Sequence, residues 1–113
     1  MVHVLAVILL MTSSAGTIAG LQPTSATSPA LDWVREFGST GTDAANCIAV
    51  DPVGDAYIGG NVNYALPGQR YAGRSDAFLR KYDSSGIELW TRQFGGRADD
   101  LVLDICLDAS GNV

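Results

Sequence analysis

The sequence predicts an all-β fold built from repeated units, and three observations support this prediction. A block of sequence returns at a fixed offset, because Trp-Val-Arg-Glu-Phe-Gly at 33–38 reappears as Trp-Thr-Arg-Gln-Phe-Gly at 90–95, a period of 57 residues (90 − 33 = 57). Short apolar runs alternate with Gly- and Asp-containing turn signals, as is typical of all-β folds. No segment shows a convincing helical period. Such a period indicates stacked units that bury their hydrophobic faces against one another.

Six residues of the first copy return in register in the second copy. They are Trp33, Phe37, Gly38, Asp43, Asp51 and Gly54, which return as Trp90, Phe94, Gly95, Asp100, Asp108 and Gly111. These blocks resemble the SBBP family, a bacterial β-propeller repeat with the pattern Trp-x-Arg-x-Phe-Gly, then Asp before an apolar strand, then Asp-x-x-Gly-Asn and an aromatic strand. The resemblance covers about residues 33–113. It implies a β-propeller fragment with about one four-stranded blade and parts of neighbouring blades.

The sequence departs from this pattern at a few positions. Asp55 stands where the second copy and the family pattern have Asn, here Asn112, and Cys47 and Cys106 are not part of the pattern. Two cysteines in a secreted chain first suggest a disulfide. However, the repeat register places both on the same face of equivalent strands, and that face of one blade meets the opposite face of the next. We therefore expect two buried, unpaired thiols.

Three regions follow one another along the chain. Residues 1–20 contain an apolar run at 4–11 followed by small and polar residues, which predicts a secretory signal peptide; the alternatives are a misplaced start codon or the hydrophobic end of a longer N-terminal segment. Residues 21–32 are rich in Pro, Ser and Thr and predict a flexible linker. Residues 33–113 hold the repeats. The eight apolar residues at 4–11 are too few for a stable membrane span, which needs about 20.

The repeat region predicts five strands, at 33–37, 46–51, 56–60, 77–83 and 88–94. The segment 46–51 is apolar on both faces, so we expect it to be innermost in its blade and buried on two sides. The segments that begin at Trp33 and Trp90 suit outer strands with one wet side. One complete blade then spans 46–94, and 33–37 belongs to a different blade.

The number of repeats and the charge limit the function. A chain of 113 residues holds roughly one and a half periods, whereas a propeller typically has about four to eight blades, so we expect a fragment of a longer protein or a truncated product. The remaining blades of a longer parent are then natural partners. The 7 basic and 12 acidic residues give a net charge of −5 without a basic stripe, which argues against a nucleic-acid partner.

Most repeated polar residues have a structural interpretation. The Asp-x-x-Gly turns beginning at Asp51, Asp83 and Asp108 predict hairpin loops in which the Asp accepts bonds from amides two or three residues on. Asp43, Asp76 and Asp100 precede strands and are expected to pin loop amides. Trp33 and Trp90 are expected to be packing anchors rather than sugar platforms. No catalytic, cofactor-binding or metal-binding set is predicted, because each turn supplies one carboxylate and the repeat region has no His.

The long non-repetitive loop at 61–75 is the candidate contact surface. It carries Tyr64, Arg70, Tyr71 and Arg74, and Tyr with Arg is the composition of binding hot spots; the alternative is a solvated connector. The sequence thus predicts a secreted or cell-surface propeller segment with a binding or scaffolding role toward an unknown protein or carbohydrate ligand. The alternatives are a fragment of a propeller enzyme acting on polysaccharide, with carboxylates from blades absent here, and a truncated product without an independent function.

Overall fold

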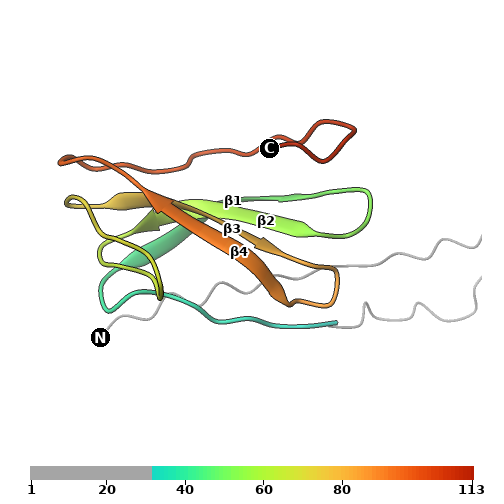
Figure 1. Cartoon of the computed structure of the whole chain (residues 1–113), viewed down its shortest axis with the longest axis horizontal. Helices are drawn as coiled ribbons and strands as arrows, with labels where there is room; N and C mark the ends of the chain where they lie inside the picture. Colours follow the sequence, from blue (N-terminus) through green and yellow to red (C-terminus); the bar gives the residue numbers. More distant parts are fainter. Residues whose placement is uncertain (1–31) are drawn as a thin grey trace, which may run out of the picture.

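The computed structural model describes residues 32–113, which form a single antiparallel sheet of four strands with no helix in that range (Figure 1). The strands are β1 (Asp43–Val50), β2 (Ala56–Val62), β3 (Asp76–Tyr82) and β4 (Glu88–Phe94). Each strand pairs with its neighbour in the chain, so the order in the sheet is β1-β2-β3-β4. This confirms the predicted all-β fold with one four-stranded blade. Residues 32–113 include no helix long and apolar enough to cross a membrane. The predicted signal peptide and residues 21–31 of the linker lie outside the described residues.

The predicted strands compare unevenly with the observed ones. The strand predicted at 88–94 has those bounds, whereas β1 starts three residues before the predicted 46 and β2 continues two residues beyond 60. The prediction of a strand at 33–37 was wrong: this segment has no ladder partner among the described residues. The repeated apolar segment at 101–107 is likewise not a strand. Both are extended segments that lie against the sheet rather than within it (Figure 1).

The register divides the sheet into two faces. On the first face, which we call the core face, Ala56 stands opposite Tyr82 and Gly60 opposite Phe78. On the other, which we call the second face, Tyr57, Lys81 and Trp90 form one row across three strands. Alternation of side chains along each strand keeps the two sets apart.

The core face packs against the leading segment 33–37. Trp33 is 8 % exposed and its ring lies 5.5 Å from that of Tyr82, while Phe37 meets Phe78 edge-on at 5.5 Å. The hydrophobic cluster comprises Trp33, Ala56, Ile58, Val62, Leu66, Phe78 and Tyr82, with Phe37 packed against it. The core therefore joins the sheet to a segment that the repeat assigns to a different blade.

The second face packs in part against the C-terminal segment 101–113. The amide of Val102 donates to the carbonyl of Gly60 at 3.3 Å, and the side chain of Asn46 donates to the carbonyl of Val102 at 2.9 Å. Gly59 makes room for this contact, because a Cβ there would lie 2.6 Å from Val102 Cγ1 and 2.9 Å from Cys47 Sγ. A side chain at Gly59 would push the two layers apart.

The first strand is less buried than its apolar sequence predicts. β1 was expected to be buried on both sides, yet Ile48 is 50 % exposed and Val50 is 45 % exposed, whereas Ile58 on β2 is buried. β1 is an edge strand, and the leading segment covers the core face over β3 rather than over β1. Ile48 and Val50, on the core face of β1, therefore lack a covering layer within residues 32–113.

Candidate functional site

The sheet has two ends with different polar structure. One end, which we call the turn end, carries the turns 51–55, 83–87 and 108–112. The opposite end, which we call the loop end, carries the segments 38–43, 61–75 and 95–100. The turn end repeats one hydrogen-bond pattern, and the loop end contains the non-repetitive residues that the sequence singled out.

The three Asp-x-x-Gly turns share one geometry. In the first, Asp51 Oδ1 accepts from the amides of Val53 at 3.1 Å and Asp55 at 2.9 Å, and Asp83 and Asp108 accept in the same way from the amides two and four residues on. The expected spacing of two or three residues was therefore wrong at its outer bond. Each turn glycine has positive φ, with 91° at Gly54, 78° at Gly86 and 77° at Gly111, a conformation that glycine adopts without a steric penalty.

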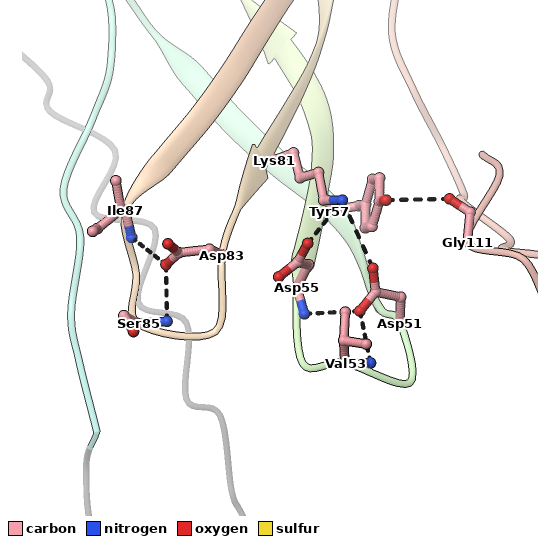
Figure 2. Close-up of polar contacts among 9 residues, drawn as sticks. All are labelled: Asp51, Val53, Asp55, Tyr57, Lys81, Asp83, Ser85, Ile87 and Gly111. Atoms are coloured by element: carbon pink, nitrogen blue, oxygen red, sulfur yellow. Dashed lines mark hydrogen bonds and ion pairs between the residues drawn. The ribbon is translucent and has the colours of Figure 1, made fainter.

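The first turn holds an ion-pair cluster that the sequence did not reveal. Lys81, from β3, reaches across β2 and places its Nζ 2.8 Å from Asp55 Oδ2 and 3.8 Å from Asp51 Oδ2 (Figure 2). The same ammonium lies 4.7 Å from the centre of the Tyr57 ring. The hydrogen bond to Asp55, followed by the contact with Tyr57, raises the pKa of Lys81 above its usual value. One lysine thus pairs with two carboxylates of the turn, more closely with Asp55 than with Asp51.

In the third turn a side-chain amide, rather than a lysine, contacts the Asp carboxylate. Asn112 occupies the position of Asp55, and its Nδ2 donates to Asp108 Oδ2 at 2.7 Å. This bond, together with the backbone bond from Asn112, lowers the pKa of Asp108 below its usual value. The third turn is tied to the sheet by Tyr57, whose hydroxyl donates to the carbonyl of Gly111 at 3.2 Å (Figure 2). The Asp55 departure from the repeat is therefore matched by Lys81.

At the loop end, three aspartates hold the chain before a strand or its equivalent. Each accepts from the amide four residues earlier: Asp43 from Ser39 at 2.6 Å, Asp76 from Ala72 at 2.8 Å and Asp100 from Gly96 at 2.7 Å. The repeated glycines make room for these carboxylates, since a Cβ at Gly38 would lie 2.8 Å from Asp43 Oδ2 and one at Gly95 would lie 2.7 Å from Asp76 Oδ1. The repeated Gly and Asp therefore form a loop in which the Asp carboxylate lies inside the turn and accepts a backbone amide.

The long loop is clamped to β4 by Gln93. Its Oε1 accepts from the amide of Leu66 at 2.8 Å, and its Nε2 donates to Asp76 Oδ2 at 2.9 Å and to the carbonyl of Tyr64 at 3.3 Å. Its own amide donates to Gln69 Oε1 at 3.0 Å. Leu66 is 1 % exposed, so one residue of the candidate contact loop belongs to the core. Three of these four hydrogen bonds fix the loop on β4, and the fourth joins Gln93 to Asp76 at the start of β3.

Two tyrosines lie together on the outside of this loop. Tyr64 and Tyr71 stack with ring centres 5.7 Å apart and an interplanar angle of 30°, and they are 54 % and 36 % exposed. The Tyr71 hydroxyl donates to the carbonyl of Arg74 at 2.6 Å. Partial desolvation, followed by the charge of Asp76, raises the pKa of Tyr71. Arg70 and Arg74 are also exposed, so all four predicted contact residues lie on the surface of the loop end.

The two repeated tryptophans lie in different surroundings. Trp33 is buried, and its Nε1 donates to the carbonyl of Ser84 at 3.2 Å. Trp90 is half-buried and meets Tyr57 edge-on with ring centres 6.1 Å apart. Trp33 packs from the leading segment onto the sheet, whereas Trp90 packs against Tyr57 within its own sheet.

The cysteines are free, as predicted, but they are not buried. Cys47 is half-buried against Gly59, and Cys106 is exposed. Burial raises the pKa of the Cys47 thiol above its usual value. The two thiols therefore differ in accessibility although they lie in repeated segments.

A buried arginine, Arg80, is the third polar residue without a signal in the sequence, after Lys81 and Gln93. Arg80 is 4 % exposed, its Nε donates to Thr91 Oγ1 at 2.7 Å, and its guanidinium lies 4.0 Å from the centre of the Phe37 ring. Thr91 in turn donates to Glu88 Oε1 at 2.6 Å. No repeat or spacing signals this network, because its members come from neighbouring strands. Within residues 32–113, no three His, Cys, Asp or Glu side chains gather as a metal site would require.

Comparison with known families now assigns the repeat. Residues 32–63 match the SBBP beta-propeller repeat family. The match covers the leading segment, β1, the first turn and β2, and the second copy at 90–112 keeps its spacing. The four-stranded antiparallel sheet is consistent with this match, which suggests a propeller-type segment. No curated protein matches the chain.

Proposed function

We propose that this SBBP segment serves as a binding or scaffolding unit of a longer, secreted or cell-surface bacterial β-propeller protein, and that the loop end is its contact surface. The observation that carries the proposal is the stacked pair Tyr64–Tyr71, which is exposed while its loop is fixed on the sheet by Gln93. Aromatic side chains give contact area at low entropic cost, and a fixed loop loses little freedom on binding.

The charges of the loop end support a contact role rather than a chemical one. Asp43, Asp76 and Asp100 each accept a loop amide, so these carboxylates hold the backbone. The side chains that face solvent at this end include Tyr64, Tyr71, Arg70 and Arg74. Guanidinium and phenol groups recognise carboxylate, hydroxyl and aromatic groups, which suits a protein or carbohydrate ligand. We therefore propose a non-enzymatic role for this segment.

The test compares the loop end with the turn end in the full-length parent. We expect Tyr71→Ala with Arg74→Ala to abolish binding in a panel of soluble bacterial polysaccharides and solubilised envelope proteins, with Tm nearly unchanged because exposed substitutions usually change stability by under about 0.5 kcal/mol. Val53→Ala is the matched control, because Val53 is 75 % exposed at the opposite end. Normal binding by the loop variant, or equal loss in the control, would refute the proposal.

A further inference from the structure

The contact loop at 61–75 is joined through its backbone to a second loop, 95–100. The amide of Asp100 donates to the carbonyl of Ser75 at 2.8 Å. Ser75 also forms a bridge with Asp99, and the two segments run parallel there. The residues around position 97 therefore lie beside those around position 73, next to the part of the loop that carries Tyr71.

Gly73 lets the two loops touch. A Cβ at Gly73 would overlap the carbonyl of Gly96 and would lie 2.9 Å from the carbonyl oxygen of Ala98, and these two residues flank Arg97. Arg74 follows Gly73, so Arg74 and Arg97 belong to segments in direct contact. Both arginines are exposed, and neither takes part in an ion pair within residues 32–113.

Asp99 is an unused acceptor beside these arginines. The other three aspartates of the loop end each hold a backbone amide. Asp99 is exposed instead, and its carboxylate takes part in no hydrogen bond or ion pair among the described residues. It lies near the phenol of Tyr71, because its charge adds to desolvation and to the charge of Asp76 in raising the pKa of Tyr71. The surface thus offers donors and an acceptor beside an aromatic pair.

The repeat shows that positions 97 and 99 face solvent when a sheet follows them. Their equivalents in the first copy, 57 residues earlier, are Thr40 and Thr42. Both threonines are exposed although β1 to β4 follow them. The contact loop reaches this first loop as well, since a Cβ at Gly41 would lie 2.6 Å from Tyr64 Cδ2. A sheet and its contact loop therefore leave these two positions open.

The charges of this surface nearly balance. Three arginines accompany three aspartates in the contact loop, the first residue of β3 and the loop 95–100, namely Arg70, Arg74 and Arg97 with Asp76, Asp99 and Asp100. The buried Asp43 of the segment 38–43 adds a fourth acidic group. Such a surface has no positive field to attract a polyanion, whereas hydroxyl groups can use both its donors and its acceptors.

The size of the surface favours a small repeating unit over a protein. Its exposed aromatic and charged side chains are Tyr64, Arg70, Tyr71, Arg74, Arg97 and Asp99, whereas a stable protein interface uses about 20 to 30 residues on each side. A sugar ring has an apolar C–H face and hydroxyl groups around its edge. It can therefore stack on an aromatic ring and bond to polar side chains at the same time.

From these observations we infer that the ligand of the loop end is a neutral carbohydrate and that Asp99 is one of the residues that bind it. A sugar ring stacks on the exposed side of the tyrosine pair. One of its hydroxyl groups donates to the Asp99 carboxylate, and another accepts from Arg74 or Arg97. This inference rests on the proposed contact role of the loop end, and it adds the class of ligand and a binding residue outside the predicted set.

The first test compares ligands by isothermal titration calorimetry with the full-length parent. The neutral probes are dextran, galactomannan and arabinoxylan, and the anionic probes are alginate and single-stranded DNA. We expect a neutral polysaccharide to bind, with an affinity that changes by less than about twofold between low salt and about 0.3 M NaCl. Binding only to an anionic probe or to a solubilised envelope protein overturns the inference but leaves the contact role intact. Absence of all binding overturns both.

The second test uses the sign of the effect of Asp99. We expect Asp99→Ala to weaken binding of the neutral polysaccharide by about tenfold, because it removes an acceptor that forms a charge-assisted hydrogen bond. Glu36→Ala is the matched control, since it removes the same charge from an exposed site on the leading segment. Circular dichroism checks that both variants keep the sheet. Unchanged binding would show that Asp99 is only solvated, and stronger binding would show an anionic ligand that Asp99 repels. Either result, or an equal loss in the Glu36 variant, overturns the inference.

Discussion

The two copies of the repeat, 33–55 and 90–112, have nearly the same pattern in different surroundings. Trp33 is buried and Trp90 is half-buried; Cys47 is half-buried, whereas Cys106 is exposed. The difference arises because the two copies have different neighbours. The apolar segment of the first copy forms β1 within the sheet, whereas the equivalent segment of the second copy, 101–107, lies against the sheet. The repeat thus specifies which groups face a neighbour, and the neighbour determines how buried they become.

The largest expected effect separates the two tryptophans. We expect Trp33→Ala to lower the free energy of unfolding by about 3 to 5 kcal/mol, the usual cost of removing a packed aromatic, and Trp90→Ala to cost clearly less. The reason is that Trp33 belongs to the core cluster, whereas Trp90 meets Tyr57 at an open face. Urea denaturation of dilute protein, followed by circular dichroism, measures both. Equal losses would break the comparison between the copies.

The next effect compares the first turn, where Lys81 pairs with Asp55, with the third turn, where Asn112 bonds to Asp108. Lys81→Met leaves Asp51 and Asp55 side by side without their cation, so we expect a lower Tm, most clearly at low salt. Adding Asp55→Asn reproduces the arrangement of Asn112 in the third turn and should restore most of the loss. Differential scanning calorimetry of the two single variants and the double variant measures the coupling. Additive losses would show that Lys81 and Asp55 act independently.

The rates at which Cys47 and Cys106 are alkylated give a third comparison of the two copies. Because burial raises the pKa of Cys47 while Cys106 is exposed, we expect iodoacetamide near pH 8 to modify Cys106 several-fold faster. Peptide mass spectrometry after timed quenching resolves the two sites, and the ratio should approach one in concentrated urea. Faster modification of Cys47 in the folded chain would contradict the packing of its thiol against the second face.

The smallest expected effect is the dependence of stability on pH that arises from Asp108 in the third turn. The pKa of Asp108 is lowered in the folded chain, so its contribution to stability is present above its ordinary pKa of 3.8 and is lost as pH falls through the lower folded value. Carboxyl chemical shifts in an NMR titration should therefore give Asp108 a midpoint below 3.8, and Asn112→Ala should move that midpoint upward. A midpoint that Asn112→Ala leaves unchanged would exclude the side-chain amide as the cause.

The sequence predicts the sheet better than it predicts burial. β4 has its predicted bounds and the turns lie where Asp and Gly mark them, because strand alternation and positive φ are local properties. The partners of Trp33 lie about fifty residues along the chain, so its burial and the exposure of Ile48 depend on packing between layers. The Gln93 clamp and the Lys81 ion pairs also connect distant segments without a sequence pattern. The exposure of Tyr64 and Tyr71 agrees with the expected contact loop, but their stacking had no signal in the sequence.

The order of strands has a consequence for folding during synthesis. Each strand pairs with the next one along the chain, so the sheet grows hairpin by hairpin, and such local pairing favours rapid folding. The leading segment is different, because Trp33 bonds to Ser84 across a separation of 51 residues. It leaves the ribosome before all four strands, yet it finds its partner only after the β3–β4 turn has formed. We therefore expect the nascent chain to pass through a state with a complete β2–β3 hairpin and an uncovered core face, in which chaperone binding would protect it most.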